Sequence, residues 1–217
     1  MTRFIPYSVY NGQKNMDIDS ELLEEAISNQ LDYPIFRLYG WEPACISLGR
    51  NQDESFIDKE FLSENNIELV RRLTGGRALL HDKEITYSYI CPVSYLKHGE
   101  HIISSYKEIC EILIKKFHKL GIDLTFGESK PVKTGFDYCM LISTGADLCY
   151  KNRKLIGSAQ CRKQGYILQH GSILYDYNKP LLEKIFNESV STDEIISIKE
   201  INSKLTLEEI IAILSEE

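Results

Sequence analysis

Two adjacent glycines, Gly75 and Gly76, constrain the folding of this chain more than any other feature. They interrupt an apolar run that begins at Ile67 and resumes at Ala78, so the segment is predicted to form a strand, a tight loop and a second strand. Glycine has no Cβ atom and can adopt a positive φ, so a pair of glycines lets a ligand lie against bare backbone. For the two glycines alone, an ordinary hairpin turn is the commoner explanation.

Hydrogen-bond donors surround this glycine pair. Arg71, Arg72 and Arg77 flank it, and His81 follows. A plain turn does not need such a group of donors, whereas they suit a bound carboxyl, carbonyl or phosphate group. The stretch is therefore predicted to be a binding loop.

The amino-acid sequence of the whole stretch also resembles a known signature. From Arg71 to Ser88 it reads Arg-Arg-Leu-Thr-Gly-Gly-Arg-Ala-Leu-Leu-His-Asp-Lys-Glu-Ile-Thr-Tyr-Ser. This resembles the signature of the lipoate ligase and octanoyltransferase superfamily, and patterns at 34–52 and 152–174 match the same superfamily. Lipoate ligases usually have Ser-Gly-Gly-Gly and then His-Asp-x-Gly-Asn here, so Arg77 and Glu84 favour the octanoyltransferases that carry a cysteine in a loop.

The resemblance implies a fold class. It is the α/β fold of the biotin and lipoate ligase catalytic domain, with a mixed, largely antiparallel sheet flanked by helices. We expect residues 1–217 to form a single such domain, because 217 residues with 43% hydrophobic content can bury one sizeable core.

Periodicity predicts the elements independently. The clearest is a helix over 104–120, with Ser104 or Ser105 as its N-terminal cap. The segment 127–152 lacks clear periodicity and is predicted to be a long loop or lid. The other predictions are helices over 15–30, 53–64, 179–187 and 206–215, strands over 35–39 and 45–48, and strand pairs within 66–92 and 152–174.

Composition narrows the possible partners. The net charge of -7 argues against a general nucleic-acid binder, so an acidic partner would have to meet a local basic patch. No stretch approaches the ~20 apolar residues of a membrane span, and the first residues lack a signal peptide, so we expect a cytoplasmic protein without membrane contact. The six cysteines are scattered and are interpreted as reduced thiols.

Lys154 is the first candidate for chemistry. From local sequence alone, a solvated lysine at a strand edge is the commoner explanation. However, the segment from Asn152 to Gln160 resembles the catalytic lysine motif of the superfamily, with Asn152 in place of glycine. The resemblance implies that Lys154 hydrogen-bonds an acyl carbonyl and stabilises the oxyanion formed during attack.

Cys139 is the second candidate. It precedes the lysine motif by the spacing of the acyl-accepting cysteine in the resembling transferases, although Met140 stands where phenylalanine is common. A cysteine taken alone is more often structural than catalytic. Cys149 is the alternative nucleophile, and Cys161 is interpreted as incidental.

The resemblance also implies a substrate-binding set, drawn from the glycine loop and the last strand pair. Trp41 is interpreted as packing rather than as a ligand contact. The implied binding residues are Arg71, Arg72, Thr74, Gly75, Gly76, Arg77, His81, Gly157, Ser158, Ala159, His170 and Gly171.

The implied activity is transfer of an octanoyl group from acyl carrier protein to a lysine of the glycine-cleavage H protein or of a lipoyl domain of a 2-oxo acid dehydrogenase. The acyl group would pass through a cysteine thioester, with no metal or cofactor. Two alternatives stay open: a lipoate ligase that uses ATP, and an acyl-binding module without catalysis. The sequence does not determine the acceptor, the acyl chain length or the oligomeric state.

Overall fold

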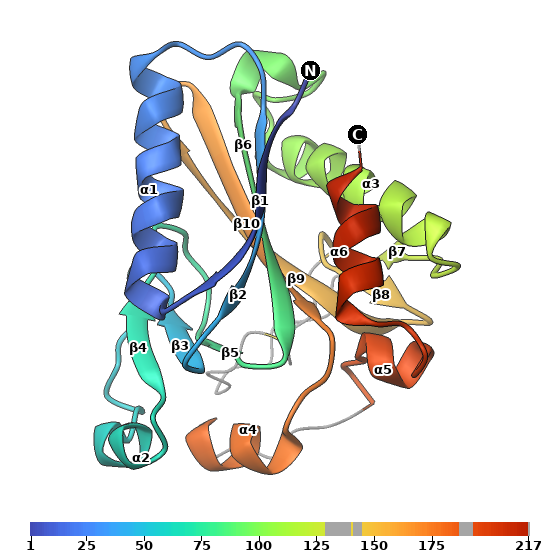
Figure 1. Cartoon of the computed structure of the whole chain (residues 1–217). Helices are drawn as coiled ribbons and strands as arrows, with labels where there is room; N and C mark the ends of the chain where they lie inside the picture. Colours follow the sequence, from blue (N-terminus) through green and yellow to red (C-terminus); the bar gives the residue numbers. More distant parts are fainter. Residues whose placement is uncertain (129–139, 141–144, 187–192, 217) are drawn as a thin grey trace.

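The computed structural model describes residues 1–128, 140, 145–186 and 193–216. Within them the chain forms two β-sheets surrounded by helices (Figure 1). The large sheet has the order β1-β2-β6-β10-β9-β8-β7 and the small sheet the order β4-β3-β5. The strands are β1 (Arg3–Tyr10), β2 (Ile35–Trp41), β3 (Cys45–Leu48), β4 (Glu68–Arg71), β5 (Leu79–His81), β6 (Glu84–Pro92), β7 (Thr125–Phe126), β8 (Leu148–Tyr150), β9 (Arg153–Lys163) and β10 (Tyr166–Leu174). The helices are α1 (Gly12–Ser28), α2 (Lys59–Glu64), η1 (Val93–Tyr95), α3 (Ile102–Lys119), α4 (Lys179–Phe186), α5 (Ile198–Ile201) and α6 (Leu207–Ser215).

The mixed, largely antiparallel sheet implied by the resemblance is confirmed. Among the described strands, β1 pairs with β2 in parallel and β3 with β4 in parallel. The other pairings are antiparallel. No helix in the described ranges is both long and apolar enough to cross a membrane.

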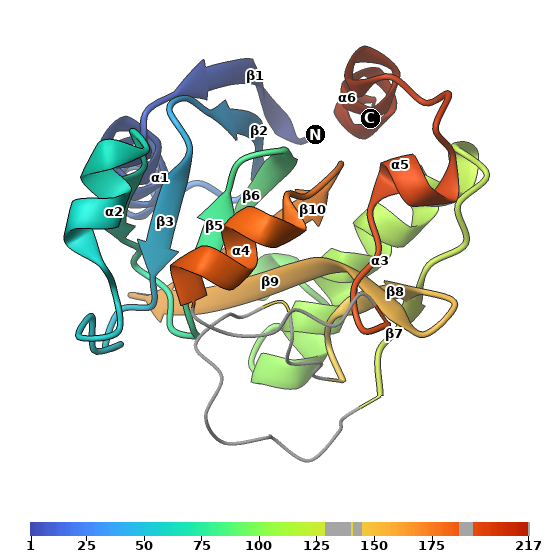
Figure 2. The ribbon, with the colours of Figure 1, turned by 90° about the horizontal axis from the view of Figure 1, so that it is seen from below.

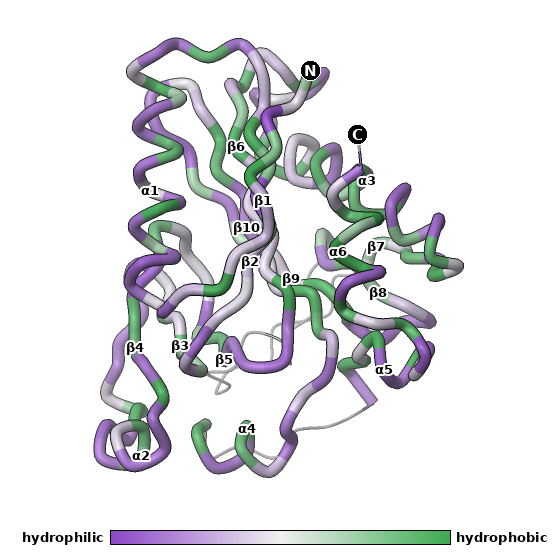
Figure 3. Tube along the Cα trace, in the orientation of Figure 1, coloured by the Kyte–Doolittle hydropathy of each residue, from purple (hydrophilic) through white to green (hydrophobic). Residues whose placement is uncertain are grey.

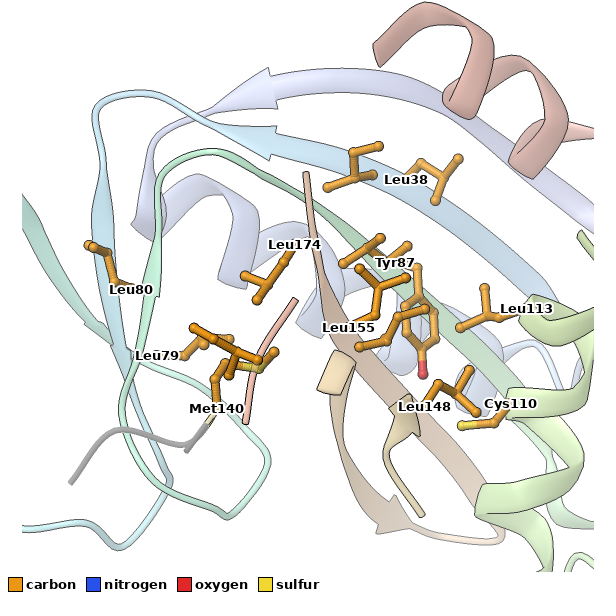
Figure 4. Packing of buried hydrophobic residues seen from close by; sticks show 14 of the residues in the cluster. Leu38, Leu79, Leu80, Tyr87, Cys110, Leu113, Met140, Leu148, Leu155 and Leu174 are labelled. Atoms are coloured by element: carbon orange, nitrogen blue, oxygen red, sulfur yellow. The ribbon is translucent and has the colours of Figure 1, made fainter. Parts of the chain in front are cut away.

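Helices cover both faces of the large sheet. On one face, α1 packs against Ile90 and Leu168; on the other, Cys110 and Leu113 of α3 face Tyr87 of β6 (Figure 4). Figure 2, seen from below, shows α1 and α2 on one side of the molecule and α3 and α6 on the other. Because the sheet is covered twice, all of β6 is buried and its residues need not alternate between apolar and polar.

The small sheet corrects the prediction for the glycine stretch. β4 and β5 do not pair with each other; both pair with β3, which lies between them. The chain therefore crosses from one edge of β3 to the other through residues 72–78, and the glycine pair is not a hairpin turn. The backbone N–H of Arg72 donates to the Leu48 carbonyl and that of Arg50 to the Thr74 carbonyl, which holds this crossing loop against the end of β3.

Several helices and strands begin or end at residues other than those predicted. Helix α3 begins at Ile102 after His101, and the hydroxyl of Ser105 donates to the Ile102 carbonyl inside the first turn, so neither predicted serine is the cap. Helix α2 begins only at Lys59, where Asp58 caps it. Strand β8 lies inside the segment predicted as a loop, and the short helix α5 was not predicted.

A buried carboxylate fixes α1 to the large sheet. Along helix α1, hydrophobic and hydrophilic residues alternate (Figure 3). Asp19, on the side of α1 that faces the large sheet, is nevertheless buried. Its carboxylate accepts from Arg37 at 2.8 Å and from the Tyr39 hydroxyl at 2.9 Å, and lies 3.3 Å from Nδ1 of His170. Burial alone would raise the pKa of Asp19. The hydrogen bond with His170 and the positive charge of Arg37 outweigh this effect and lower the pKa below its usual value.

Replacing Asp19 should therefore be costly. Asp19→Ala leaves the Arg37 guanidinium buried without its counter-ion, and we expect a loss of roughly 3–5 kcal/mol in the free energy of unfolding, measured with urea. Asp17→Ala, in the same helix, is the control and should change stability little, because within the described residues the half-buried Asp17 carboxylate accepts only from the exposed Gln13 side chain. Equal effects of the two substitutions would contradict this role for Asp19.

Candidate active site

A cavity that opens to solvent lies between the two sheets. Strands of the large sheet form its floor, while β3 and β5 of the small sheet and the start of α1 form its walls. The lining residues are Met16, Tyr39, Trp41, Ser47, Arg72, Leu79, His81, Thr86, Met140, Gly157, Ser158, Ala159, His170, Gly171 and Ser172.

The floor runs across the strands of the large sheet. Gly157 on β9 pairs with Ser172 on β10, Ser172 pairs with Thr86 on β6, and Thr86 pairs with Tyr39 on β2. This row therefore crosses four neighbouring strands, with Gly157 at the β9 end and Tyr39 at the β2 end. Register partners project to the same face of a sheet, so the small residues Gly157, Ser172 and Thr86 lie side by side on the floor.

A β-bulge aims Lys154 at the β9 end of this row. Leu148 pairs with Ile156, but the next residue, Cys149, pairs with Lys154, so β9 contains one extra residue there. On a regular strand, residues three apart point to opposite faces. The bulge changes this, and Lys154 Nζ lies 3.2 Å from the place where a Cβ on Gly157 would stand.

The ammonium of Lys154 is part of a buried ion pair. Its Nζ lies 3.1 Å from Oδ2 of Asp147, and the two side chains are only 2% and 3% exposed. An ammonium has three N–H groups and can therefore donate to more than one acceptor. Met140 Sδ lies 2.8 Å from the same Cβ position of Gly157, so Lys154 and Met140 meet at Gly157. Met140 and Gly157 line the cavity, whereas Lys154 and Asp147 lie behind its lining.

Two stacked rings close the other end. The rings of Trp41 and His81 are 3.9 Å apart with 18° between their planes. Trp41 Nε1 donates to Thr86 Oγ1 at 2.8 Å, while His81 Nε2 lies 2.8 Å from Ser47 Oγ and His81 Nδ1 3.1 Å from Glu84 Oε1. Burial lowers the pKa of His81 although the Glu84 carboxylate acts in the opposite direction, which favours the neutral ring.

The glycine loop wraps around the guanidinium of Arg72. Arg72 donates to Thr74 Oγ1 at 3.1 Å and to the carbonyl oxygens of Gly75 and Arg77, each at 2.8 Å. Thr74 Oγ1 in turn lies 2.7 Å from Nε2 of His170. The loop backbone is thus turned towards Arg72, and it is Arg72 that lines the cavity.

The structure brings part of the predicted binding set together. Thr74, Gly75, Gly76 and Arg77 belong to the loop around Arg72 and do not line the cavity, and Arg71 donates from outside it to the carbonyls of Gly49 and Gln52. The predicted residues that do line the cavity are Arg72, His81, Gly157, Ser158, Ala159, His170 and Gly171.

Sequence reasoning missed other lining residues. Trp41 was interpreted as packing; it is packed against Tyr39, and it lines the cavity as well. Thr86 and Ser172 are polar residues on strands that are buried on both faces. A polar residue in a buried strand indicates a possible cavity, so this pattern could have identified both of them. Ser47 and Met140 offered no such signal.

The cysteines are placed differently from one another. Cys139, the predicted nucleophile, lies outside the described residues, and the next residue, Met140, lines the cavity. Cys149 is buried and is the register partner of Lys154. Cys161 is partly buried near the end of β9, and burial raises the pKa of its thiol. Burial also raises the pKa of Cys45, Cys91 and Cys110.

Comparisons with known proteins assign the fold and the chain to a class. Residues 11–217 match the family described as the lipoyl protein ligase A/B catalytic domain. Octanoyltransferase LipM of Staphylococcus aureus is 36% identical over 195 residues, covering 85% of this chain and 68% of its own. Octanoyltransferase LipM of Clostridioides difficile is 39% identical over 188 residues, with the same coverage. The crystal structure of lipoate-protein ligase A bound with ATP superposes with a TM-score of 0.77 at 22% identity, covering 98% of this chain and 82% of that one.

The chain therefore belongs to the lipoyl protein ligase A/B catalytic domain family. Because its curated relatives are octanoyltransferases, the chain is an acyltransferase enzyme. The solved ligase, at 22% identity, supports the fold alone.

Proposed function

We propose that this chain transfers an octanoyl group from an acyl carrier protein to a lysine of a lipoyl-accepting protein, through a thioester on Cys139. The proposed acceptors are the glycine-cleavage H protein and the lipoyl domains of 2-oxo acid dehydrogenases. The observation that carries the proposal is the buried Lys154, aimed by a bulge at one end of a cavity that crosses the sheet. The octanoyltransferase names of the relatives support the choice of acyl group.

In the first step, the Cys139 thiolate attacks the carbonyl carbon of the octanoyl thioester. A new C–S bond forms, the C–S bond to the carrier's arm breaks, and the released thiolate takes up a proton. Both reactant and product are thioesters, so the step needs no ATP. An N–H of Lys154 donates to the carbonyl oxygen while that oxygen carries negative charge.

In the second step, the neutral amine of the acceptor lysine attacks the Cys139 thioester. The C–N bond forms, the C–S bond to Cys139 breaks, and the sulfur leaves as a thiolate while the nitrogen loses its extra proton. Formation of an amide from a thioester makes this step favourable. The same Lys154 donor serves both steps, because the oxyanion forms at the same carbonyl oxygen.

Two observations support Cys139 as the nucleophile. Its neighbour in sequence, Met140, lines the cavity and packs at Gly157 beside Lys154. The described thiols with resolved pKa shifts all have raised values, which lowers their thiolate fraction. Cys149 remains the alternative, since it pairs with Lys154 across β8 and β9.

A basic groove suits the docking of the acidic carrier protein. Five cationic side chains and one glutamate line it, although the chain as a whole carries a net charge of -7. Arg72 lines both the groove and the cavity, so the two are adjacent. From Cys161 in the groove to Gly157 on the floor, β9 spans roughly 13 Å, a distance that an extended thioester arm can cover. The lining residues are Leu23, Glu24, Arg50, Arg71, Arg72, Leu73, Cys161, Arg162 and Lys163.

Charge reversal in this groove tests the docking proposal. Arg50 is exposed, and in the described part of the chain its guanidinium has no hydrogen-bond or ion-pair partner. Arg50→Glu should slow acylation by octanoyl carrier protein about tenfold at low salt, because it weakens electrostatic attraction of the carrier. Acylation by a small neutral octanoyl thioester should stay unchanged.

The control is Lys204→Glu, the same charge change at an exposed site between α5 and α6, away from the groove (Figure 1). Equal slowing by both substitutions, or slowing with the small thioester as well, would exclude docking at the groove. If only transfer to the acceptor slows, the acceptor and not the carrier docks there.

The acyl-enzyme itself can be observed by mass spectrometry of the intact protein. Incubation with octanoyl carrier protein should add the mass of one octanoyl group, and Cys139→Ser should abolish both this adduct and turnover, because a serine hydroxyl is far less acidic than a thiol. Cys149→Ser and Cys161→Ser are the matched controls and should retain both. An adduct that persists in Cys139→Ser would assign the nucleophile to another thiol.

A ligase is distinguished in the same experiment. It would give no adduct from octanoyl carrier protein and would transfer the acyl group only with ATP. An acyl-binding module without catalysis would give neither adduct nor transfer.

Removal of the Lys154 donor should separate catalysis from stability. Lys154→Ala should slow octanoyl transfer roughly 10²–10³-fold, as for loss of one oxyanion donor. It should also destabilise the fold, because Asp147 is left as a buried charge without this partner. The double variant with Asp147→Ala should recover stability in urea unfolding but not activity. If the double variant regains transfer, Lys154 acts only through folding.

A further inference from the structure

We infer that Ser47, His81 and Glu84 form a nucleophilic triad, which gives this chain a second activity, the hydrolysis of small carboxylic esters. Ser47 and His81 line the cavity at the end that the stacked rings close, and Glu84 lies behind them. The inference does not rest on the proposed octanoyl transfer, which uses a thiol and Lys154.

Three neighbouring strands bring the triad together (Figure 2). Ser47 on β3 is the register partner of Leu79 on β5. His81, two residues beyond Leu79, projects to the same face of the small sheet, and Glu84 opens β6. His81 Nε2 lies 2.8 Å from Ser47 Oγ, and His81 Nδ1 lies 3.1 Å from Glu84 Oε1. At such distances a hydroxyl, an imidazole and a carboxylate act as nucleophile, base and orienting group.

The hydrogen bonds around the triad fix the positions of its protons. Arg72 Nη1 donates to Ser47 Oγ at 3.2 Å, and a guanidinium cannot accept, so the hydrogen of Ser47 is left to donate to His81. The neutral ring of His81 then accepts at Nε2 and carries its own hydrogen on Nδ1, which donates to Glu84. Thr86 donates to the same carboxylate oxygen, so this oxygen acts as an acceptor from both sides. This is the tautomer that a base beside a serine requires.

The surroundings also keep the imidazole neutral. Burial lowers the pKa of His81 below its usual value; the Glu84 carboxylate acts in the opposite direction, while the charges of Arg72 and His170 lower the pKa further. A histidine with a lowered pKa is unprotonated at neutral pH and can take the proton of a neighbouring hydroxyl. The indole of Trp41, stacked at 3.9 Å, holds the plane of the ring.

The reaction needs only the ester and water. Ser47 Oγ attacks the ester carbonyl carbon, its proton passes to His81 Nε2, and the carbonyl oxygen becomes an oxyanion beside the Arg72 guanidinium. The C–O bond to the alcohol breaks, and the alcohol leaves with the proton of His81. Water then attacks the Ser47 ester and gives a proton to His81. The bond from the acyl carbon to Oγ breaks, Ser47 recovers its proton from His81, and the carboxylic acid leaves.

The triad and Lys154 act on different carbonyl groups. Lys154 lies beside Gly157, whereas Thr86 hydrogen-bonds the triad. Gly157 and Thr86 are two strand steps apart, which amounts to roughly 10 Å at about 4.8 Å per step. A thioester carbonyl held at Gly157 therefore lies away from the triad. The substrate of the triad is a small neutral ester that enters as far as the rings, where the face of Trp41 suits a short alkyl group.

Diisopropyl fluorophosphate tests the triad directly, because it reacts with an activated serine hydroxyl: an Oγ–P bond forms, the P–F bond breaks and fluoride leaves. Wild-type protein should gain the mass of one diisopropylphosphoryl group, and peptide digestion should place the group on Ser47. Absence of the adduct, or its location on another residue, would overturn the inference.

Substitutions separate the nucleophile from the orienting group. Ser47→Ala should abolish both the adduct and the hydrolysis of p-nitrophenyl acetate, the latter measured in a Cys139→Ala background so that this thiol does not contribute. Glu84→Gln keeps the shape of the side chain, but its NH2 group favours the opposite tautomer of the imidazole, and it should slow both reactions roughly 10³–10⁴-fold. The control is Ser88→Ala on β6, which should leave both unchanged. Ser88 is buried, does not line the cavity, and has no hydrogen-bond partner for its hydroxyl within the described residues.

The pH dependence distinguishes a base from a structural group. Labelling of the wild type by the fluorophosphate should rise with pH, with a midpoint below about 6.5, because His81 acts only as the neutral ring and its pKa is lowered. In Glu84→Gln the midpoint should move to lower pH, because the carboxylate that raises the pKa of His81 is gone. Circular dichroism defines the pH range over which the fold is intact. Labelling that does not vary with pH in this range, or an unshifted midpoint in Glu84→Gln, would overturn the triad.

The two proposals can fail separately. An octanoyl adduct from the carrier protein without labelling of Ser47 would remove the triad and leave the transferase. Labelling of Ser47 without an octanoyl adduct would do the reverse. If Ser47→Ala does not fold, the mapped adduct on the wild type and the rate of Glu84→Gln decide, and a rate within a few-fold of wild type in Glu84→Gln overturns the inference.

Discussion

A buried ion pair holds the layers of this molecule together. Asp19 of α1 meets Arg37 of β2 and His170 of β10 on the covered face of the large sheet. His170 continues the network through Thr74 to Arg72, whose guanidinium organises the glycine loop. Buried charges are stable only when they are paired and hydrogen-bonded, so this network fixes α1, the large sheet and the loop in one arrangement. The cavity exists because these three parts are held at fixed positions around it.

The glycine pair contributes to this arrangement through its backbone. Gly76 adopts φ +98°, a left-handed backbone that favours glycine, and its carbonyl oxygen lies so close to Gly49 that a Cβ there would stand 1.8 Å away. The loop can therefore close on Arg72, with the Gly75 carbonyl accepting from it. Some of the arginine donors that resemble a ligand-binding cluster in the sequence therefore donate to carbonyl oxygens of the protein itself. Arg72 is the member of the cluster that both supports the loop and reaches the cavity.

Local patterns predicted the elements well and their spatial relations poorly. The alternation and turn residues of β9 and β10 located that strand pair, and the apolar spacing of α3 located the helix, because periodicity records which face is buried. The strand pairing expected across the glycine loop was wrong, since only long-range pairing with β3 decides where β4 and β5 lie. The resemblance to the family singled out Lys154 as a candidate, but it could not indicate the β-bulge at Lys154 or the ion pair with Asp147. The end of the cavity at Trp41 escaped prediction, because an aromatic residue that packs and one that lines a cavity have the same local sequence.

The residues that distinguish this chain from ligases in sequence act behind the cavity rather than in it. Glu84 is not among the lining residues, yet it hydrogen-bonds His81 and Thr86 and so helps to position the stacked rings of His81 and Trp41. The main chain of Arg77 likewise contributes through its carbonyl, which accepts from Arg72. On this argument the signature marks the support of the cavity rather than its lining.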